Sequence, residues 1–332
     1  MADLGTAYLG FQLAHPLVPG ASPLADSIDE VRRLEDAGAP MITLRSLIVT
    51  PLRFCDDARL IDRNELGNPR GSVFAGLQEP PQHALQPSKY CEHIACLRRV
   101  LNPNVPIVAS LYARRLKDWL TCARLVEQAG ADGLELNIYG MTAIPDLGDT
   151  SIERRILEVV GAVTSNIHIP VAVKVIPFCK SFGYFLRKLP SAGAHGLVLF
   201  NGFHQSDWNV ETVNDPFLHT IATPLDPYYR FHWLSRLSGS IAADLAFSGG
   251  ARNAMHAIKA VMCGAHAVQV ATVLIRHGPK RLQSLVENMN TWLDQHDYQS
   301  LQQVRGRVTP QRFDTLGAFE MAYNRNILMG PS

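Results

Sequence analysis

Two adjacent glycines, Gly249 and Gly250, directly follow an apolar stretch that ends at Ser248. Glycine lets backbone N–H groups approach an anion closely, and a helix that begins nearby favours negative charge. Ala271 and Thr272 follow the next apolar stretch in the same way. These residues predict a phosphate-binding loop, and the alternative for a glycine pair taken alone is an ordinary tight turn.

A lysine, Lys174, lies inside the apolar sequence VAVKV (171–175), where a strand buried on both faces is expected. Burial of an ammonium group is costly unless the group is paired or faces developing negative charge. Three interpretations follow. Lys174 forms a Schiff base, or it lies beside an electron-rich cofactor ring, or it makes a structural ion pair with Glu135 or Asp244.

Two asparagines, Asn137 and Asn201, each end an apolar stretch. A neutral amide both donates and accepts hydrogen bonds, so it suits recognition of an imide, an amide or the edge of a flavin; the alternative is capping of a loop.

Metal-ligand spacing is absent from the sequence. The cluster CEHIAC (91–96) falls in an expected helix, where Cys91 and Cys96 diverge around the axis, so we interpret them as ordinary thiols.

Composition restricts the class of protein. The chain has 332 residues, of which only 18% are charged, and its formal net charge is +1, so nucleic acid and anionic membranes are poor partners. The six cysteines form no CxxC pair, and the amino terminus lacks a signal-peptide pattern, which indicates reduced thiols and a cytoplasmic location. Apolar runs stay shorter than a membrane span.

The elements that must position these residues follow a repeated pattern. An amphipathic stretch, a glycine and a short apolar run recur four times, in the segments 36–44, 128–136, 191–199 and 262–270. Glycine suits the left-handed residue that ends a helix, and the apolar run suits a strand of a parallel sheet. Each copy therefore predicts a helix, a glycine stop and a parallel strand.

Eight such strands are expected, alternating with eight helices. The strands are 16–20, 41–44, 106–112, 133–137, 170–175, 196–200, 241–247 and 267–271. This alternation predicts one (β/α)8 TIM barrel spanning 1–332, with an open doubly wound sheet as the structural alternative. A short hairpin around Gly10 precedes the barrel, long connections follow strand two (46–86) and strand six (201–226), and a tail covers 307–332.

Several motifs in this order carry a family resemblance. PGASPL (19–24), LELNIY (134–139), VAVKVIPF (171–178), LVLFNG (197–202), AFSGG (246–250) and VQVATVL (268–274) resemble dihydroorotate dehydrogenases, as do YQSLQQVRG (298–306) and AFEMAYNRN (318–326). The resemblance covers nearly the whole chain and is closest to the cytosolic class 1 enzymes and their divergent dihydroorotate dehydrogenase-like relatives. It implies a flavin mononucleotide (FMN) barrel that oxidises dihydroorotate to orotate in pyrimidine biosynthesis.

The resemblance also implies roles for individual residues. Ala21 and Ser22 match flavin contacts of the first strand. Asn137 matches an asparagine that contacts flavin and substrate. Lys174 matches the lysine near N1 of the flavin, and Asn201 matches an asparagine that contacts the substrate. Arg45 stands where a lysine is common at the end of strand two. The phosphate cradle is matched by Ser248, Gly249, Gly250, Ala271 and Thr272.

The catalytic base departs from the family. Class 1 enzymes carry a cysteine three residues after the strand-four asparagine, where this chain has Gly140, and Met141-Thr142 replaces the family's Pro-Asn. Tyr139, Thr142 and His204 are the candidate bases that remain, with Tyr139 placed beside Lys174 and Asn137 in the predicted catalytic set.

Three hypotheses stay open. They are an FMN oxidoreductase acting on a small C–C or C=C substrate, a flavin-binding protein that lost catalysis, and a Schiff-base aldolase using Lys174. We expect a homodimer. The chain has no cysteine cluster for an iron–sulfur centre, so any such centre belongs to a separate redox partner.

Overall fold

Eight parallel strands enclose the interior of the protein. The computed structural model describes residues 2–49, 86–138, 149–177, 182–202, 206–207, 218–219, 226–309 and 321. The strands are β3 (Leu17–Pro19), β4 (Ile42–Val49), β5 (Ile107–Ala113), β6 (Gly133–Asn137), β7 (Val171–Val175), β8 (Gly196–Leu199), β11 (Asp244–Ser248) and β12 (Ala267–Val270). Their order is β3-β12-β11-β8-β7-β6-β5-β4, and β3 and β4, at its two ends, also contact each other. This confirms the predicted (β/α)8 barrel.

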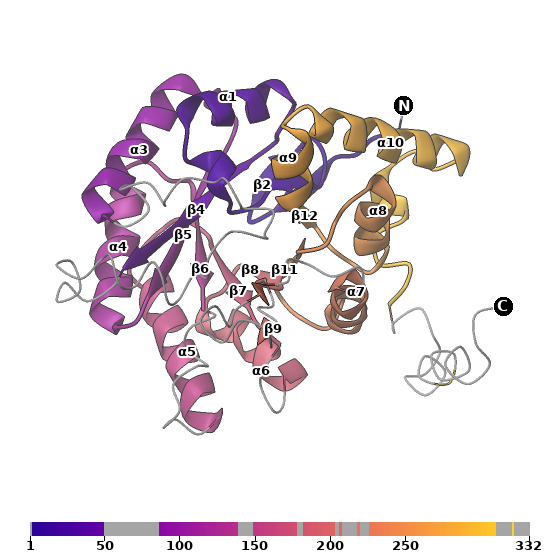
Figure 1. Ribbon diagram of the computed structural model, residues 1–332. Coiled ribbons are helices and arrows are strands. Elements are labelled where there is room, and N and C mark those ends of the chain that lie inside the picture. The colour runs from indigo at the N-terminus through magenta and orange to yellow at the C-terminus, as the bar shows by residue number, and fades with distance from the viewer. Residues whose placement is uncertain are drawn as a thin grey trace.

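Helices surround the strands (Figure 1). They are α1 (Ile28–Asp36), α3 (Pro87–Val100), α4 (Leu116–Gln128), α5 (Asp149–Thr164), α6 (Phe182–Lys188), α7 (Asp226–Leu237), α8 (Ala254–Met262), α9 (Thr272–His277) and α10 (Arg281–Gln295). In all four predicted repeats the glycine has a positive φ: 87° at Gly38, 98° at Gly130, 98° at Gly193 and 102° at Gly264. The repeat is therefore a helix, a left-handed glycine and a strand, as predicted.

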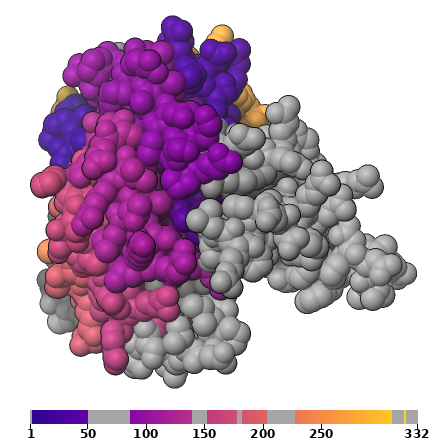
Figure 2. Space-filling view, turned by 90° about the vertical axis from the view of Figure 1, so that its left-hand side faces the viewer, coloured from indigo at the N-terminus to yellow at the C-terminus, as the bar shows by residue number. Residues whose placement is uncertain are grey.

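Each barrel strand is buried on both faces. Outward side chains such as Leu134 and Leu136 pack against the helices in the main hydrophobic core. Inward side chains such as Val108, Ala172 and Val198 form a second cluster inside the barrel. The space-filling view from the side of α3, α4 and α5 shows these helices forming a continuous outer face (Figure 2).

A hairpin closes the amino-terminal end of the barrel. β1 (Thr6–Tyr8) pairs with β2 (Phe11–Leu13), and Leu9 and Gly10 turn between them with φ of 52° and 82°. Tyr8 and Leu9 pack into the inner cluster. Gly196 leaves them room, because a Cβ there would lie 2.7 Å from Cδ2 of Leu9. The predicted hairpin is confirmed, and it acts as the floor of the barrel.

Two strand boundaries differ from the sequence prediction. β4 continues to Val49 instead of ending at Leu44, and its register shifts between Thr43 and Ser46. β11 starts at Asp244, after a turn that follows α7. A small antiparallel pair, β9 (Ser206–Asp207) with β10 (Leu218–His219), lies in the long connection predicted after strand six (201–226). Most of that connection, residues 50–85 and most of the tail lie outside the described residues.

Candidate functional site

The carboxyl-terminal ends of the strands form one rim, which we call the mouth. It gathers most residues that the sequence singled out: Ala21, Ser22, Asn137, Lys174, Asn201, Ser248, Gly249, Gly250, Ala271 and Thr272. The strand register places them there, since Asn137 lies opposite Lys174 and Ser248 lies opposite Gln269. A rim of this kind holds the active site in barrels of this fold.

Lys174 belongs to a buried group of three side chains inside the mouth. Its Nζ lies 3.2 Å from Oε1 of Glu135 and 2.8 Å from Oε1 of Gln269, to both of which it donates. Gln269 in turn donates through Nε2 to Oε2 of Glu135 at 2.6 Å. The three residues are at most 6% exposed. Because Glu135 only accepts, it fixes both the lysine and the orientation of the Gln269 amide.

The structure decides between the two predicted ion-pair partners of Lys174. Glu135 is the partner. Asp244 is not, because it lies at the other end of the barrel, where it accepts the N–H of Leu9 at 2.7 Å. An ammonium group has three N–H donors, and within the described residues Lys174 has acceptors for two of them. No described residue accepts the third donor, which suits a ligand at the mouth.

A chain of neutral polar groups crosses the mouth beside Lys174. Oγ of Ser46 and Oγ of Ser110 are 2.7 Å apart, and Asn137 donates through Nδ2 to Ser46 at 3.3 Å. Asn201 donates to Oδ1 of Asn137 at 2.8 Å and accepts the N–H of Gly202 at 3.0 Å. These bonds use one N–H of each amide, so both asparagines keep a second donor within the described part of the chain.

Tyr90 of α3 supports this chain from behind. Its hydroxyl accepts the N–H of Ser110 at 3.0 Å and lies 2.9 Å from the carbonyl oxygen of Arg45. Burial raises the pKa of Tyr90 well above its ordinary value, so the hydroxyl stays neutral. Tyr90 thereby ties β4 to β5 at the level of Ser46 and Ser110.

The glycine loop after β11 has the geometry of an anion cradle. Gly249 and Gly250 have φ of 93° and 85°, which only glycine adopts without strain. No acceptor within the described residues takes the backbone N–H groups of Gly249, Gly250 and Ala251. The turn requires glycine, and within the described residues its N–H donors have no acceptor. Binding of a phosphate there stays a prediction.

The ends of β12 and β3 lie beside each other. The N–H of Gly20 donates to the carbonyl oxygen of Val270 at 3.0 Å, which places Ala21 and Ser22 next to Ala271 and Thr272. Ser22 is buried, and α9 begins at Thr272. The predicted first-strand contacts and the second half of the predicted cradle are thus adjacent.

Arg45 occupies a different place from the one predicted. It lies within β4 rather than at its end, beside the register shift. Its Nη1 is 2.7 Å from Oδ2 of Asp26, in the turn that follows Ser22. Arg45 therefore links β4 to the segment after β3, and its charge is paired with a carboxylate.

The candidate bases cannot be placed. Tyr139, Gly140, Thr142 and His204 lie outside the described residues. Their roles stay predictions from the sequence.

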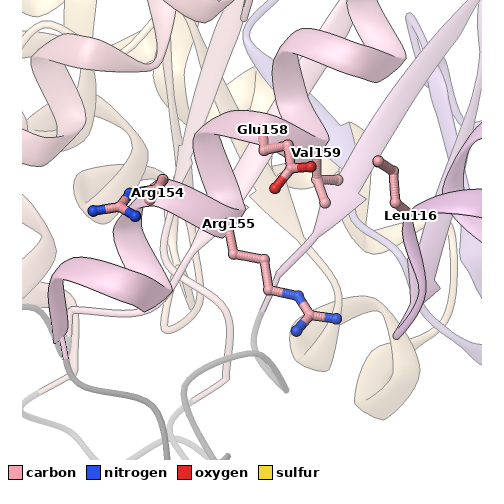
Figure 3. A pocket seen from close by; sticks show the side chains of 5 residues that line it. All are labelled: Leu116, Arg154, Arg155, Glu158 and Val159. Carbon is pink, nitrogen blue, oxygen red and sulfur yellow. The ribbon is translucent and has the colours of Figure 1, made fainter.

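A separate cavity of about 250 Å³ lies on the outer helical layer, between α4 and α5 (Figure 3). Arg155 extends from α5 toward the side that carries Leu116, while Arg154 points the other way. Glu158 and Val159 complete the lining. None of the mouth residues lines this cavity.

The thiols of the described residues are ordinary. Cys91 and Cys96 are free and lie on α3, as predicted for the CEHIAC segment. Burial raises the pKa of Cys122 to about 11 and that of Cys263 to about 12. No group of three metal-ligating side chains occurs among residues the structure describes. No described helix has both the length and the apolar character needed to cross a membrane.

Sequence reasoning did not identify the contributions of four residues. Gln269 had a usable signal, because a polar residue interrupts the apolar run AVQVA (267–271). Nothing in the sequence indicated that the hydroxyls of Ser46 and Ser110 meet. Arg230 of α7 donates through Nε to the carbonyl oxygen of Ser248. It had no signal, because a single arginine in YYRFHW (228–233) fits any amphipathic helix.

Comparison with known proteins gives consistent relatives at low identity. No protein-family model matches the chain. A protein of Aeropyrum pernix described as a dihydroorotate dehydrogenase A (fumarate) is 24% identical over 320 residues, which cover 92% of this chain and 97% of the relative. The dihydroorotate dehydrogenase B (NAD(+)) catalytic subunit of Geobacter sp. is 25% identical over 92% of this chain and 98% of its own length. The NAD-dependent dihydropyrimidine dehydrogenase subunit PreA of Escherichia coli is 21% identical, with 92% and 76% covered.

Proposed function

We propose that this chain, a divergent relative of the dihydroorotate dehydrogenases, is an FMN-dependent oxidoreductase acting on a CH–CH bond. The default substrate by analogy with the relatives is dihydroorotate, oxidised to orotate. The relatives named above are dehydrogenases of cyclic pyrimidine derivatives, so we infer a small cyclic amide as the substrate class.

The observation that carries this proposal is the buried Lys174 with one N–H donor left for a ligand. A cation with a free donor suits an electron-rich acceptor such as the N1 edge of a flavin. The unaccepted N–H groups at Gly249 to Ala251 suit the phosphate of FMN. Two separate parts of the mouth thus fit the two ends of one cofactor.

Asn137 and Asn201 would orient the substrate. The hydrogen bonds through Ser46, Asn137 and Gly202 fix both amides and leave one N–H on each. These donors suit the carbonyl oxygens of a cyclic amide. Bound FMN would supply a hydride acceptor for this oxidation, and one of the candidate bases Tyr139, Thr142 and His204 would take the accompanying proton. Lys174 would hold positive charge beside the flavin.

An absorption spectrum of the purified protein tests the cofactor, and anaerobic addition of substrate tests the reaction. We expect a flavin spectrum that bleaches on addition of dihydroorotate or of dihydrouracil, the uncharged analogue. A Lys174→Met variant should slow the bleaching. Absence of flavin binding even after incubation with FMN would refute the proposal.

A second candidate rests on Gly140. If this position removed the base, the protein binds flavin without turnover, and its spectrum stays oxidised with either substrate. A Gly140→Cys variant would then restore bleaching, whereas bleaching by the unchanged protein excludes this candidate.

The Schiff-base alternative is disfavoured by the contacts of Lys174. Its Nζ donates to Glu135 and Gln269, and an ammonium ion-paired with a buried carboxylate has no lone pair with which to attack a carbonyl. Borohydride trapping with a carbonyl substrate should therefore leave Lys174 unmodified.

We also propose a homodimer and a separate redox partner. Two of the relatives are named as subunits, which supports an assembly with another chain. Light scattering of the purified protein measures its mass and so tests the homodimer. Electron transfer to NAD, measured with and without cell extract, tests for the redox partner.

A further inference from the structure

Gln269 of β12 reaches across the inside of the barrel, beneath the mouth. In the sheet, β11 and β8 lie between β12 and β7, and β6 is one strand further away. The Gln269 amide nevertheless contacts both distant strands: its Oε1 is 2.8 Å from Nζ of Lys174, and its Nε2 is 2.6 Å from Oε2 of Glu135. The side chain is 4% exposed. Gln269 therefore forms a buried link from β12 to β6 and β7.

Gly20 leaves room for this link. It directly follows β3, the strand that pairs with β12. A Cβ built on Gly20 would lie 3.2 Å from Cβ of Gln269 and 3.5 Å from its Oε1. Gly20 is not one of the glycines with a positive φ, so its backbone conformation does not require glycine. The space taken by the Gln269 side chain does.

The two contacts of the Lys174 ammonium differ in length. Its Nζ lies 2.8 Å from the neutral amide oxygen of Gln269 but 3.2 Å from the carboxylate oxygen of Glu135. Without the amide, the ammonium would be drawn closer to the carboxylate, because water screens opposite charges little in a buried site. Gln269 therefore holds the ammonium away from its counter-charge, and through Nε2 it also fixes the carboxylate.

The position of the ammonium decides how strongly its charge acts on a ligand at the mouth. An ammonium in close contact with Glu135 would act as one half of a nearly neutral pair, whereas an ammonium held apart from the carboxylate presents more of its positive charge. Reduction of a flavin adds negative charge to its ring, and a nearby positive charge stabilises that form. Gln269 should therefore strengthen the binding of reduced flavin relative to oxidised flavin.

We propose that Gln269 is a positioning residue that acts through Lys174 and raises the reduction potential of the bound flavin. The inference rests on the proposed function, because it requires a flavin beside Lys174. It goes beyond that function, since the resemblance gives Gln269 no role. Glu135 has the opposite effect, because its carboxylate offsets the charge of Lys174.

The test is a measurement of the two-electron reduction potential of bound FMN against a reference dye of known potential. The difference from free FMN gives the ratio of the affinities for the reduced and the oxidised cofactor. In Gln269→Met this ratio should fall about tenfold, which corresponds to a potential about 30 mV lower than in the unchanged protein. In Glu135→Gln the ratio should rise, because the counter-charge of Lys174 is gone.

A double variant shows whether Gln269 acts through the lysine. Lys174→Met should lower the potential more than Gln269→Met does, because it removes the charge itself. Adding Gln269→Met to Lys174→Met should then change the affinity ratio by less than about twofold. A full additional decrease would show that Gln269 acts on the flavin by another route and would overturn the inference.

Gln12→Met is the matched control, because it makes the same substitution at an exposed residue of β2, in the hairpin at the opposite end of the barrel, and should leave the potential unchanged. If Gln269→Met does not fold, Gly20→Ala presses on the Gln269 side chain and should also lower the potential. A potential equal to that of the unchanged protein would overturn the inference while leaving FMN binding intact. Failure of the unchanged protein to bind FMN would overturn the proposed function as well.

Discussion

The ion pair inside the mouth predicts a large and specific loss of stability. In a Lys174→Met variant, the Glu135 carboxylate keeps the Gln269 amide as its partner but loses its counter-charge. Glu135 is 1% exposed, so water cannot replace the lysine. Removal of one member of a buried ion pair costs about 3–5 kcal/mol, and this is the loss we expect in the free energy of unfolding.

This loss translates into a shift of the melting temperature. A chain of 332 residues has an unfolding entropy of roughly 0.7 kcal/mol/K, so Lys174→Met should melt about 4–7 °C lower than the unchanged protein. Glu135→Gln should lose a similar amount, because it leaves the ammonium without its carboxylate. The double variant removes both charges together and should lose much less than the two single losses combined.

The assay is a double-mutant cycle on the cofactor-free protein, followed by urea unfolding and by calorimetry. We expect a coupling free energy of about 2–4 kcal/mol between Lys174 and Glu135. Lys89 and Glu92 form the control pair, since their contact of 2.8 Å lies on the surface and should couple by well under about 1 kcal/mol. Additive losses at Lys174 and Glu135 would show that the pair contributes no stabilisation and would refute the reasoning.

Three further predictions concern backbone, protonation and thiols. Gly38→Ala, where a Cβ meets open space, should lose about 1–2 kcal/mol of unfolding free energy from its positive φ alone. Gly249→Ala should lose more, because its Cβ meets Arg230, and equal losses in urea unfolding would contradict this. Burial lowers the pKa of His15 below 6.5, so the unfolded chain binds a proton more readily than the folded protein does. The free energy of unfolding should therefore fall as pH drops from 7 to 5. If His15→Gln showed the same dependence of unfolding free energy on pH, His15 would not be its source. Cys122 and Cys263, with pKa values of about 11 and about 12, should resist iodoacetamide at pH 8 until the protein is denatured, as peptide mapping would show.

The barrel was readable from the sequence because its pattern is local and repeated. The glycine of each repeat ends its helix with a positive φ, a conformation that depends on the residue type rather than on its neighbours in space. The strands that follow were therefore located within a few residues. The end of β4 was misjudged because RSLIV (45–49) mixes polar and apolar residues, and its pairing with β5 decides its conformation. The start of β11 was misjudged because alanines 242 and 243 fit a strand or a turn equally well.

The site was readable only where a residue type is unusual for its surroundings. Lys174 stands out in an apolar strand, and its buried position followed from that. The sequence did not show that Glu135 rather than Asp244 pairs with Lys174, because both are carboxylates on strands. Only the closed barrel shows that they lie at opposite ends of it. Arg230 could not be recognised from the sequence, since its contact with the carbonyl oxygen of Ser248 depends on where α7 crosses the strands.

The hairpin at the floor of the barrel has a kinetic consequence. With Tyr8 and Leu9 filling the amino-terminal end, the described strands leave the mouth as the one route to Lys174. An electron donor and an electron acceptor that both react with a cofactor held beside Lys174 must then use the same route, so each has to leave before the other binds. Steady-state rates measured against both reactants should then give parallel double-reciprocal lines, the signature of a ping-pong sequence.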